Sequence, residues 1–166
     1  MTGNPVVRWL HAWWLNRLIS VAVLFDRNPA QWQRILDDPG AIPAAVEEIL
    51  RLLPPSQYQG RYCVEDRTFE GGTIPAGSPV LLVTGAATRD PRAFERPDEF
   101  DIDRPNIREH LAFSRGAHSC PGGPLARVEG RVSLERILDR MTNIRLDEEF
   151  HGPEGARKFN YEPTFI

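Results

Sequence analysis

The ten residues FSRGAHSCPG, Phe113 to Gly122, decide how the rest of this 166-residue sequence is interpreted. They contain Cys120, one of only two cysteines, with Gly116 four residues before it and Gly122 two residues after it. Residues 123–141 that follow have the pattern of a helix. We therefore expect Cys120 in a tight loop that leads into a helix, where glycines permit positive φ angles and let the backbone approach a flat ligand closely.

The chemistry of such a loop favours a metal-bound thiolate. A helix N-terminus offers unpaired N–H groups and a partial positive charge, and both stabilise a thiolate. A thiolate on a flat, glycine-lined shelf suits a soft metal, and haem iron is the candidate that the shelf suggests. Two alternatives stay open. Cys120 could be a small buried hydrophobe, as most lone cysteines are, or it could share a zinc site with His118, although no second ligand pair with zinc spacing is present.

The pattern F-x-x-G-x-x-x-C-x-G resembles the haem-binding sequence of the cytochrome P-450 family, the haem-thiolate monooxygenases, in its soluble bacterial form. Phe113, Gly116, Cys120 and Gly122 match the anchor positions, and His118 stands where the family commonly places a partner of a haem propionate. The resemblance implies haem b as the cofactor and Cys120 as the axial thiolate ligand of its iron. Phe113 and the two glycines would shape the shelf on which the haem lies.

A second motif precedes the cysteine loop. Glu48 and Arg51 lie three residues apart and share one face of a predicted helix, which by itself indicates a surface ion pair worth less than ~1 kcal/mol. Glu48-Ile49-Leu50-Arg51 also resembles the E-x-x-R motif of the same family. Arg104 corresponds to the arginine that completes the family's triad from a proline-punctuated coil. The resemblance therefore implies that Glu48, Arg51 and Arg104 form one partly buried network with a structural role.

A further binding residue is implied in the strand region. Arg61 lies at the start of the first predicted strand and matches the position where bacterial members of the family place a second propionate-binding arginine. The planar guanidinium fork suits a carboxylate. The alternative is a solvated charge at the edge of a strand.

The pattern of apolar residues and breakers predicts a mainly α fold with small β-sheets, an α+β class. Asn28 is expected to cap a helix that begins at Pro29, and Leu125, Val128, Val132, Leu138 and Met141 are expected to form one apolar stripe of the last helix. The expected helices are 15–25, 29–37, 44–53 and 123–141, the expected strands are 62–65, 68–70, 79–83, 144–146 and 159–161, and residues 88–104 are expected to be an ordered coil.

Composition excludes several classes of function. The chain is 41% hydrophobic with a formal net charge of −3, so its charge does not point to nucleic acid. No run approaches the ~20 apolar residues that a membrane span needs. The two cysteines, Cys63 and Cys120, are far apart and indicate a reducing compartment, so we expect a cytoplasmic location.

The resemblance also divides the chain into two parts. Residues 1–14 form an atypical segment rich in tryptophan, and residues 15–166 resemble a partial cytochrome P-450 domain, the C-terminal portion that lies on the proximal side of the haem. We expect a chain truncated at both ends, without the helix whose acid–alcohol pair activates oxygen. Accordingly no catalytic residue is assigned, and the family's monooxygenase activity is expected to be impaired.

The family's partners follow from the same resemblance. A ferredoxin-type electron donor and a small organic substrate are implied for a full-length member. Two other interpretations remain, a non-catalytic haem-binding or interaction module, and a remnant of a disrupted gene that does not fold alone.

Overall fold

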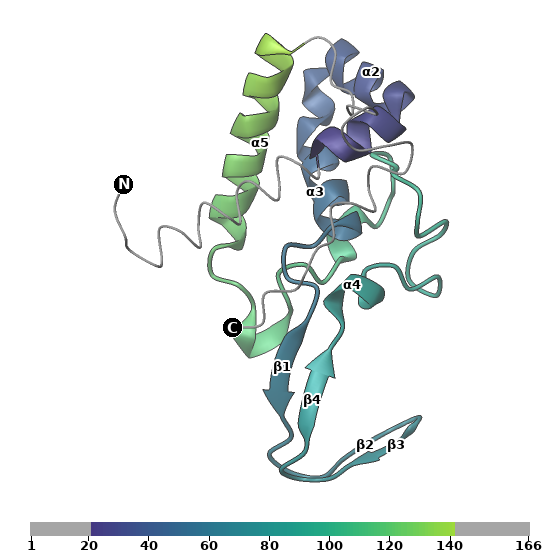
Figure 1. The fold of residues 1–166 in the computed structure, drawn as a ribbon, viewed down its shortest axis with the longest axis vertical. Helices are drawn as coiled ribbons and strands as arrows, with labels where there is room; N and C mark the ends of the chain where they lie inside the picture. The colour runs from purple at the N-terminus through teal and green to yellow at the C-terminus, as the bar shows by residue number, and fades with distance from the viewer. Residues whose placement is uncertain (1–20, 142–166) are drawn as a thin grey trace, which may run out of the picture.

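The structure is a computed structural model that describes residues 21–141, and within them the fold is mainly α-helical with two small antiparallel sheets (Figure 1). The predicted fold class is confirmed. A helical segment at 21–27 is followed by α2 (Pro29–Asp37), η1 (Pro39–Ala41), α3 (Ile42–Leu52), β1 (Gln59–Tyr62), β2 (Arg67–Phe69), β3 (Gly72–Ile74), β4 (Pro79–Leu82), α4 (Thr84–Ala87), η2 (Ile107–Glu109), η3 (Gly116–His118) and α5 (Gly123–Arg140).

Prolines set the starts of the helices. Pro29 opens α2, where a residue without an N–H group leaves no donor unpaired. Asn28 stands at the expected cap position, but its side chain makes no cap bond to α2; its Nδ2 donates instead to the carbonyl of Leu24 at 2.8 Å, on the preceding turn. The next helix, α3, begins at Ile42, two residues before the predicted start, and ends at Leu52 ahead of Pro54.

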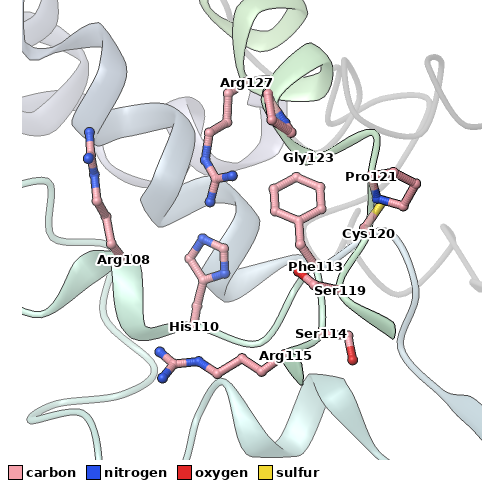
Figure 2. A pocket seen from close by; sticks show the side chains of 11 residues that line it. Arg108, His110, Phe113, Ser114, Arg115, Ser119, Cys120, Pro121, Gly123 and Arg127 are labelled. Atoms are coloured by element: carbon pink, nitrogen blue, oxygen red, sulfur yellow. The ribbon is translucent and has the colours of Figure 1, made fainter. Parts of the chain in front are cut away.

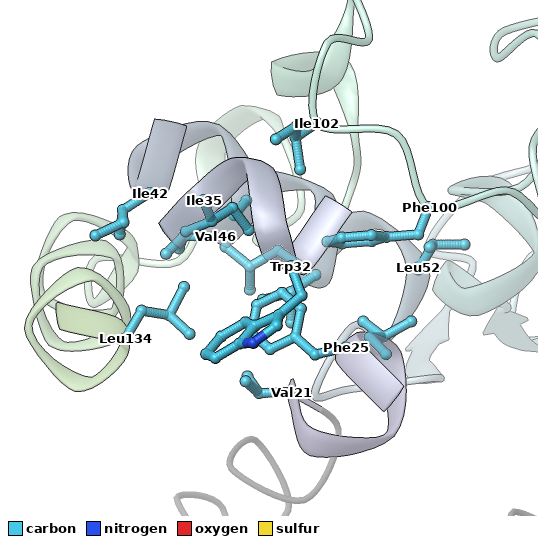
Figure 3. Packing of buried hydrophobic residues seen from close by; sticks show 14 of the residues in the cluster. Val21, Phe25, Trp32, Ile35, Ile42, Val46, Leu52, Phe100, Ile102 and Leu134 are labelled. Carbon is cyan, nitrogen blue, oxygen red and sulfur yellow. The ribbon is translucent and has the colours of Figure 1, made fainter. Parts of the chain in front are cut away.

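The hydrophobic core lies around α3, which α2 and α5 flank (Figures 1 and 3). The ring of Phe25 packs against Trp32 with their centroids 4.5 Å apart, and Phe100 meets Phe25 edge-on at 6.1 Å. Phe100 belongs to the coil before η2, so this coil packs against the core and contributes a side chain to it. The buried cluster comprises Val21, Leu24, Phe25, Trp32, Ile35, Ile42, Ala45, Val46, Ile49, Leu50, Leu52, Phe100, Ile102, Ala112 and Leu134.

The apolar stripe predicted for α5 is mostly exposed, and of its five members Leu138 alone packs against the core as a partly buried residue. Leu125, Val128 and Val132 are 62%, 51% and 41% exposed, and Met141 is exposed as well. Within α5 the buried residues are Gly123, Ala126 and Leu134. A Cβ atom added at Gly130 would lie 3.1 Å from Cγ1 of Val46, so this glycine lets α5 approach α3 closely. The covered face of α5 thus combines Leu134 with small residues, and Gly130 lets this face lie close to α3.

The strands form two antiparallel pairs, β1 with β4 and, inserted between them in the chain, β2 with β3. The first strand begins at Gln59, three residues before its predicted start, and β3 is not predicted at all. The sequence does not predict β3 because Gly71-Gly72 is typical of a turn. In the structure Gly72, with a φ of +135°, is already part of the strand and pairs with Phe69.

Some expectations fall outside the described residues. These are the segment 1–14, the first part of the helix expected at 15–25, and the strands expected at 144–146 and 159–161. Among residues 21–141, no helix has the length and apolar character that crossing a membrane requires.

Candidate functional site

Cys120 lies on a short loop between η3 and α5. Its backbone N–H donates to the carbonyl of Phe113 at 2.9 Å, and its own carbonyl accepts from the N–H of Gly123 at 3.2 Å. The first bond closes the loop across six intervening residues, and the second connects it to the first turn of α5. The thiol of Cys120 is not in a disulfide and is exposed. The loop therefore presents a sulfur atom at the start of a long helix, as the sequence predicts.

The backbone of this loop takes conformations that leave room beside the sulfur. Gly116 has a φ of +79°, which a residue with a side chain rarely adopts, and Ser114 has a φ of +60°. A Cβ atom at Gly122 would lie 3.7 Å from the Sγ atom of Cys120, so a side chain there would begin in contact with the thiol. These residues fit a flat ligand held by the sulfur. An exposed soft donor next to a glycine shelf is the donor set that a thiolate-ligated haem requires.

A pocket of about 490 Å³ lies against the same loop (Figure 2). Cys120 and Phe113 line it together with Arg108, Arg115 and Arg127, which give it a basic character. In Figure 2 the side chains of Arg127, Phe113 and His110 converge from α5 and the coil.

The structure brings Glu48, Arg51 and Arg104 together in one buried network. Arg51 donates from Nε to Oε2 of Glu48 at 2.7 Å and from Nη2 to Oε1 at 2.8 Å. Arg104 donates from Nε to the same Oε1 at 3.2 Å, and the backbone N–H of Asp101 adds a fourth donor at 3.1 Å. The side chains of Glu48 and Arg51 are completely buried.

The two arginines of this network also hold the coil. Arg51 donates to the carbonyls of Thr88, Pro97 and Glu99 at 3.0, 2.6 and 3.0 Å. Arg104 donates to the carbonyls of Glu95, Arg96 and Glu99. A coil without helix or sheet bonds thus finds partners for its buried carbonyls in two guanidinium groups.

Two predicted haem contacts, Arg61 and His118, do not line the Cys120 pocket. Arg61 is an exposed residue of β1, and its guanidinium donates to the carbonyl of Gly60 at 2.8 Å and to Oε1 of Gln59 at 3.0 Å. His118 is exposed at the end of η3. The residues that line the pocket include neither side chain.

The zinc alternative finds little support. Nowhere between residues 21 and 141 do three or more His, Cys, Asp or Glu side chains gather in a group that could hold a metal ion. His118 and Cys120 therefore have no additional zinc ligand in the part of the chain that is described.

Sequence reasoning missed a second buried carboxylate, Glu47, beside Glu48. Its side chain accepts hydrogen bonds from Nε2 of His110 at 2.9 Å and from Nε of Arg127 at 2.6 Å. Burial acts to raise the pKa of Glu47, but the hydrogen bonds from His110 and Arg127 outweigh it and lower that pKa to about 2. Two adjacent glutamates point to different sides of a helix, so the sequence indicates at most one of them as buried.

The site thus consists of an exposed cysteine on a glycine-flanked loop, at the start of a long helix in a mainly helical fold. These features are typical of a site where a thiolate binds a metal. The cytochrome P-450 family model matches residues 40–147 of the chain. The mycinamicin IV hydroxylase/epoxidase of Micromonospora griseorubida is 50% identical over 133 residues, covering 78% of this chain and 33% of that protein. The chain belongs to the cytochrome P-450 family.

Further comparisons agree. The 6-deoxyerythronolide B hydroxylase of Saccharopolyspora erythraea is 42% identical over 119 residues, covering 72% of this chain and 29% of that protein. A solved cytochrome P-450 from Mycobacterium marinum, in its substrate-free form, is 50% identical with a TM-score of 0.78 over 82% of this chain and 34% of that one. The chain thus spans about a third of the length of the curated relatives it matches.

Proposed function

We propose that this chain binds haem b and that Cys120 supplies the axial thiolate ligand of the iron. The observation that carries the proposal is the exposed thiol of Cys120 on the loop between Gly116 and Gly122, held by the bond from its N–H to the carbonyl of Phe113. When bound, haem with a thiolate ligand supplies the redox chemistry for oxygen activation. The protein's part is to hold the sulfur and leave a flat surface for the ring.

The propionates are assigned to two exposed side chains, Arg61 and His118. Within residues 21–141 the guanidinium of Arg61 bonds to its near neighbours Gly60 and Gln59, and these neutral acceptors are weaker partners than a carboxylate. A charge-assisted bond to a propionate would replace them at little cost. His118 adds a ring nitrogen two residues from Cys120.

For the whole protein we propose monooxygenation, the insertion of one oxygen atom from dioxygen into a small organic substrate. The names of the relatives, a hydroxylase/epoxidase and a hydroxylase, support this class of reaction. We also propose a ferredoxin-type electron donor, because Arg108 and Arg115 add positive charge to the surface beside Cys120 and would attract an acidic protein. The proposed location is the cytoplasm.

The Glu48, Arg51 and Arg104 network is proposed to be a structural device and not a catalytic one. It lies inside the fold, with Glu48 and Arg51 completely buried, and joins α3 to the coil between Thr88 and Glu99. Buried ion pairs contribute little net stability, but they specify one arrangement because removing one member leaves the others unpaired.

The test is the spectrum of the chain after reconstitution with haem. The reduced carbon monoxide complex is expected to show the strongly red-shifted Soret band that thiolate ligation produces. Cys120→Ala should abolish this band, whereas Cys63→Ala, the matched control, should keep it. A Cys120→Ala chain with an unchanged band would show that another group ligates the iron.

A further inference from the structure

Glu47 connects α3 to both flanks of the Cys120 loop. The side chain is 5% exposed, and its carboxylate accepts from Nε2 of His110 and from Nε and Nη2 of Arg127, the last at 3.2 Å. His110 lies in the coil three residues before Phe113, and Arg127 lies in α5, four residues after Gly123. One buried carboxylate therefore joins the segment that enters the loop to the helix that leaves it.

The hydrogen bonds of His110 specify its tautomer. The backbone N–H of Ala112 donates to Nδ1 of His110 at 3.2 Å, so Nδ1 carries no proton. Nε2 must then carry the proton that is donated to Glu47. The ring is buried, and both of its nitrogens are engaged. This arrangement holds residues 110–112 in place directly before Phe113.

Arg127 acts on Phe113 itself. The guanidinium lies over the Phe113 ring, 4.7 Å from the ring centroid, and the same guanidinium donates to Glu47. A Cβ atom at Gly123 would lie 3.5 Å from Cγ of Phe113, so the ring also packs against the first turn of α5. The ring thus has contacts from two directions, and the carbonyl of the same residue accepts the N–H of Cys120.

We propose that Glu47, His110 and Arg127 are positioning residues that determine where the Cys120 backbone, and hence its sulfur, lies. The sequence of contacts runs from the Glu47 carboxylate to the Arg127 guanidinium, to the Phe113 ring, and through the Phe113 carbonyl to the Cys120 N–H. Its importance for ligation of the iron rests on the proposed haem function, but its effect on the loop does not.

The network is distinct from the one built on Glu48. The contacts of Arg51 and Arg104 end on the coil between Thr88 and Glu99, whereas those of Glu47 end on the residues around Cys120. The adjacent carboxylates of Glu48 and Glu47 in α3 thus connect to different segments, the first to the coil before η2 and the second to the segments on both sides of the Cys120 loop.

Substitution of Arg127 tests the inference in the haem-free chain of 166 residues. Its side chain is 38% exposed, so Arg127→Gln and Arg127→Lys open no cavity in the core, and Glu47 keeps its bond to Nε2 of His110. Some general loss of stability is expected because Glu47 is buried, and the exchange rate at Ile49 in α3 measures it. Because a cation–π contact contributes about 1 kcal/mol, Arg127→Gln should speed amide hydrogen exchange at Cys120 by about fivefold. Arg131→Gln, the matched control, removes an exposed partner of Glu135 on the same helix and should leave this rate unchanged.

A second measurement uses the haem-loaded chain. Arg127→Gln should lower the share of the red-shifted carbon monoxide band and move the reduction potential, and Arg127→Lys should restore part of both, because a lysine keeps the charge but not the planar stack. Glu47→Gln should act in the same direction as Arg127→Gln. If Glu47→Gln does not fold, the comparison of Arg127→Gln with Arg127→Lys decides whether the positioning role is correct.

The outcomes separate the two proposals. If the parent chain lacks the red-shifted band, haem ligation by Cys120 is wrong, and hydrogen exchange alone decides the positioning role. The positioning role is overturned if Cys120 exchanges at the same rate in Arg127→Gln and Arg131→Gln. It is also overturned if Arg127→Gln speeds exchange equally at Ile49 in α3, because that result shows general destabilisation.

Discussion

Replacing Arg51 with alanine is the sharpest test of the buried network. This guanidinium makes two bonds to the Glu48 carboxylate and donates to the carbonyls of Thr88, Pro97 and Glu99. It also lies 5.3 Å from the centroid of the Phe94 ring. The substitution therefore removes every one of these contacts while the acceptors stay in the protein interior.

The magnitude follows from what is left behind. Glu48 is 0% exposed, and of its donors in the described part of the chain it would keep Nε of Arg104 and the N–H of Asp101. Breaking a buried ion pair by removing one partner costs about 3–5 kcal/mol. Carbonyls left without a donor cost about 1–3 kcal/mol when they stay dry, but water entering the space vacated by Arg51 would solvate some of them. We therefore expect a loss near the lower end of the ion-pair range, about 3 kcal/mol.

Urea unfolding of the full chain, followed by far-UV circular dichroism, measures the free energy of unfolding. Arg34→Ala is the matched control, because Arg34 pairs with Asp103 while their side chains are 52% and 60% exposed. That variant should lose less than ~1 kcal/mol. A loss below ~1 kcal/mol for Arg51→Ala as well would refute the reasoning, since it would mean that the buried pair has no more effect than a surface pair.

Two further predictions concern Glu47 and the propionates. Because the pKa of Glu47 is lowered from 4.5 to about 2 in the folded chain, its contribution is fully present above pH 4.5 and is lost as the pH falls towards 2. This contribution is about 3 kcal/mol; Glu47→Gln should flatten the pH dependence of urea unfolding in that interval, and an unchanged slope would contradict it. For the propionates, an Arg61→Ala, His118→Ala double variant should transfer haem to apomyoglobin faster than the parent, since each charge-assisted bond contributes about 1.5–3 kcal/mol. Equal transfer rates would remove both residues from the site.

The sequence alone predicts those features that depend on the residue itself and its near neighbours in the chain. The glycines around Cys120 indicate a tight loop because their backbone freedom is a property of the residue itself, and Pro29 marks the start of α2 for the same kind of reason. The resemblance of Glu48 and Arg51 to a known motif then indicated their partner Arg104, which the structure places within hydrogen-bond distance of Glu48.

Tertiary structure alone decided which faces are covered. Leu125, Val128 and Val132 share a stripe of α5, but the face that packs on α3 is the one where Gly130 permits close approach to Val46. Periodicity identifies a stripe without saying which neighbour lies opposite, because that neighbour is 84 residues away in the chain.

The same limit explains the missed carboxylate. From the sequence, Glu47 is expected to face solvent, as most charged residues do. It can be buried because His110 and Arg127, 63 and 80 residues further along the chain, donate hydrogen bonds to its carboxylate. A charge can be buried when its partners arrive with it. The sequence determined the loop and the motif that resembles its relatives, and the three-dimensional packing determined which charged groups support that loop from inside.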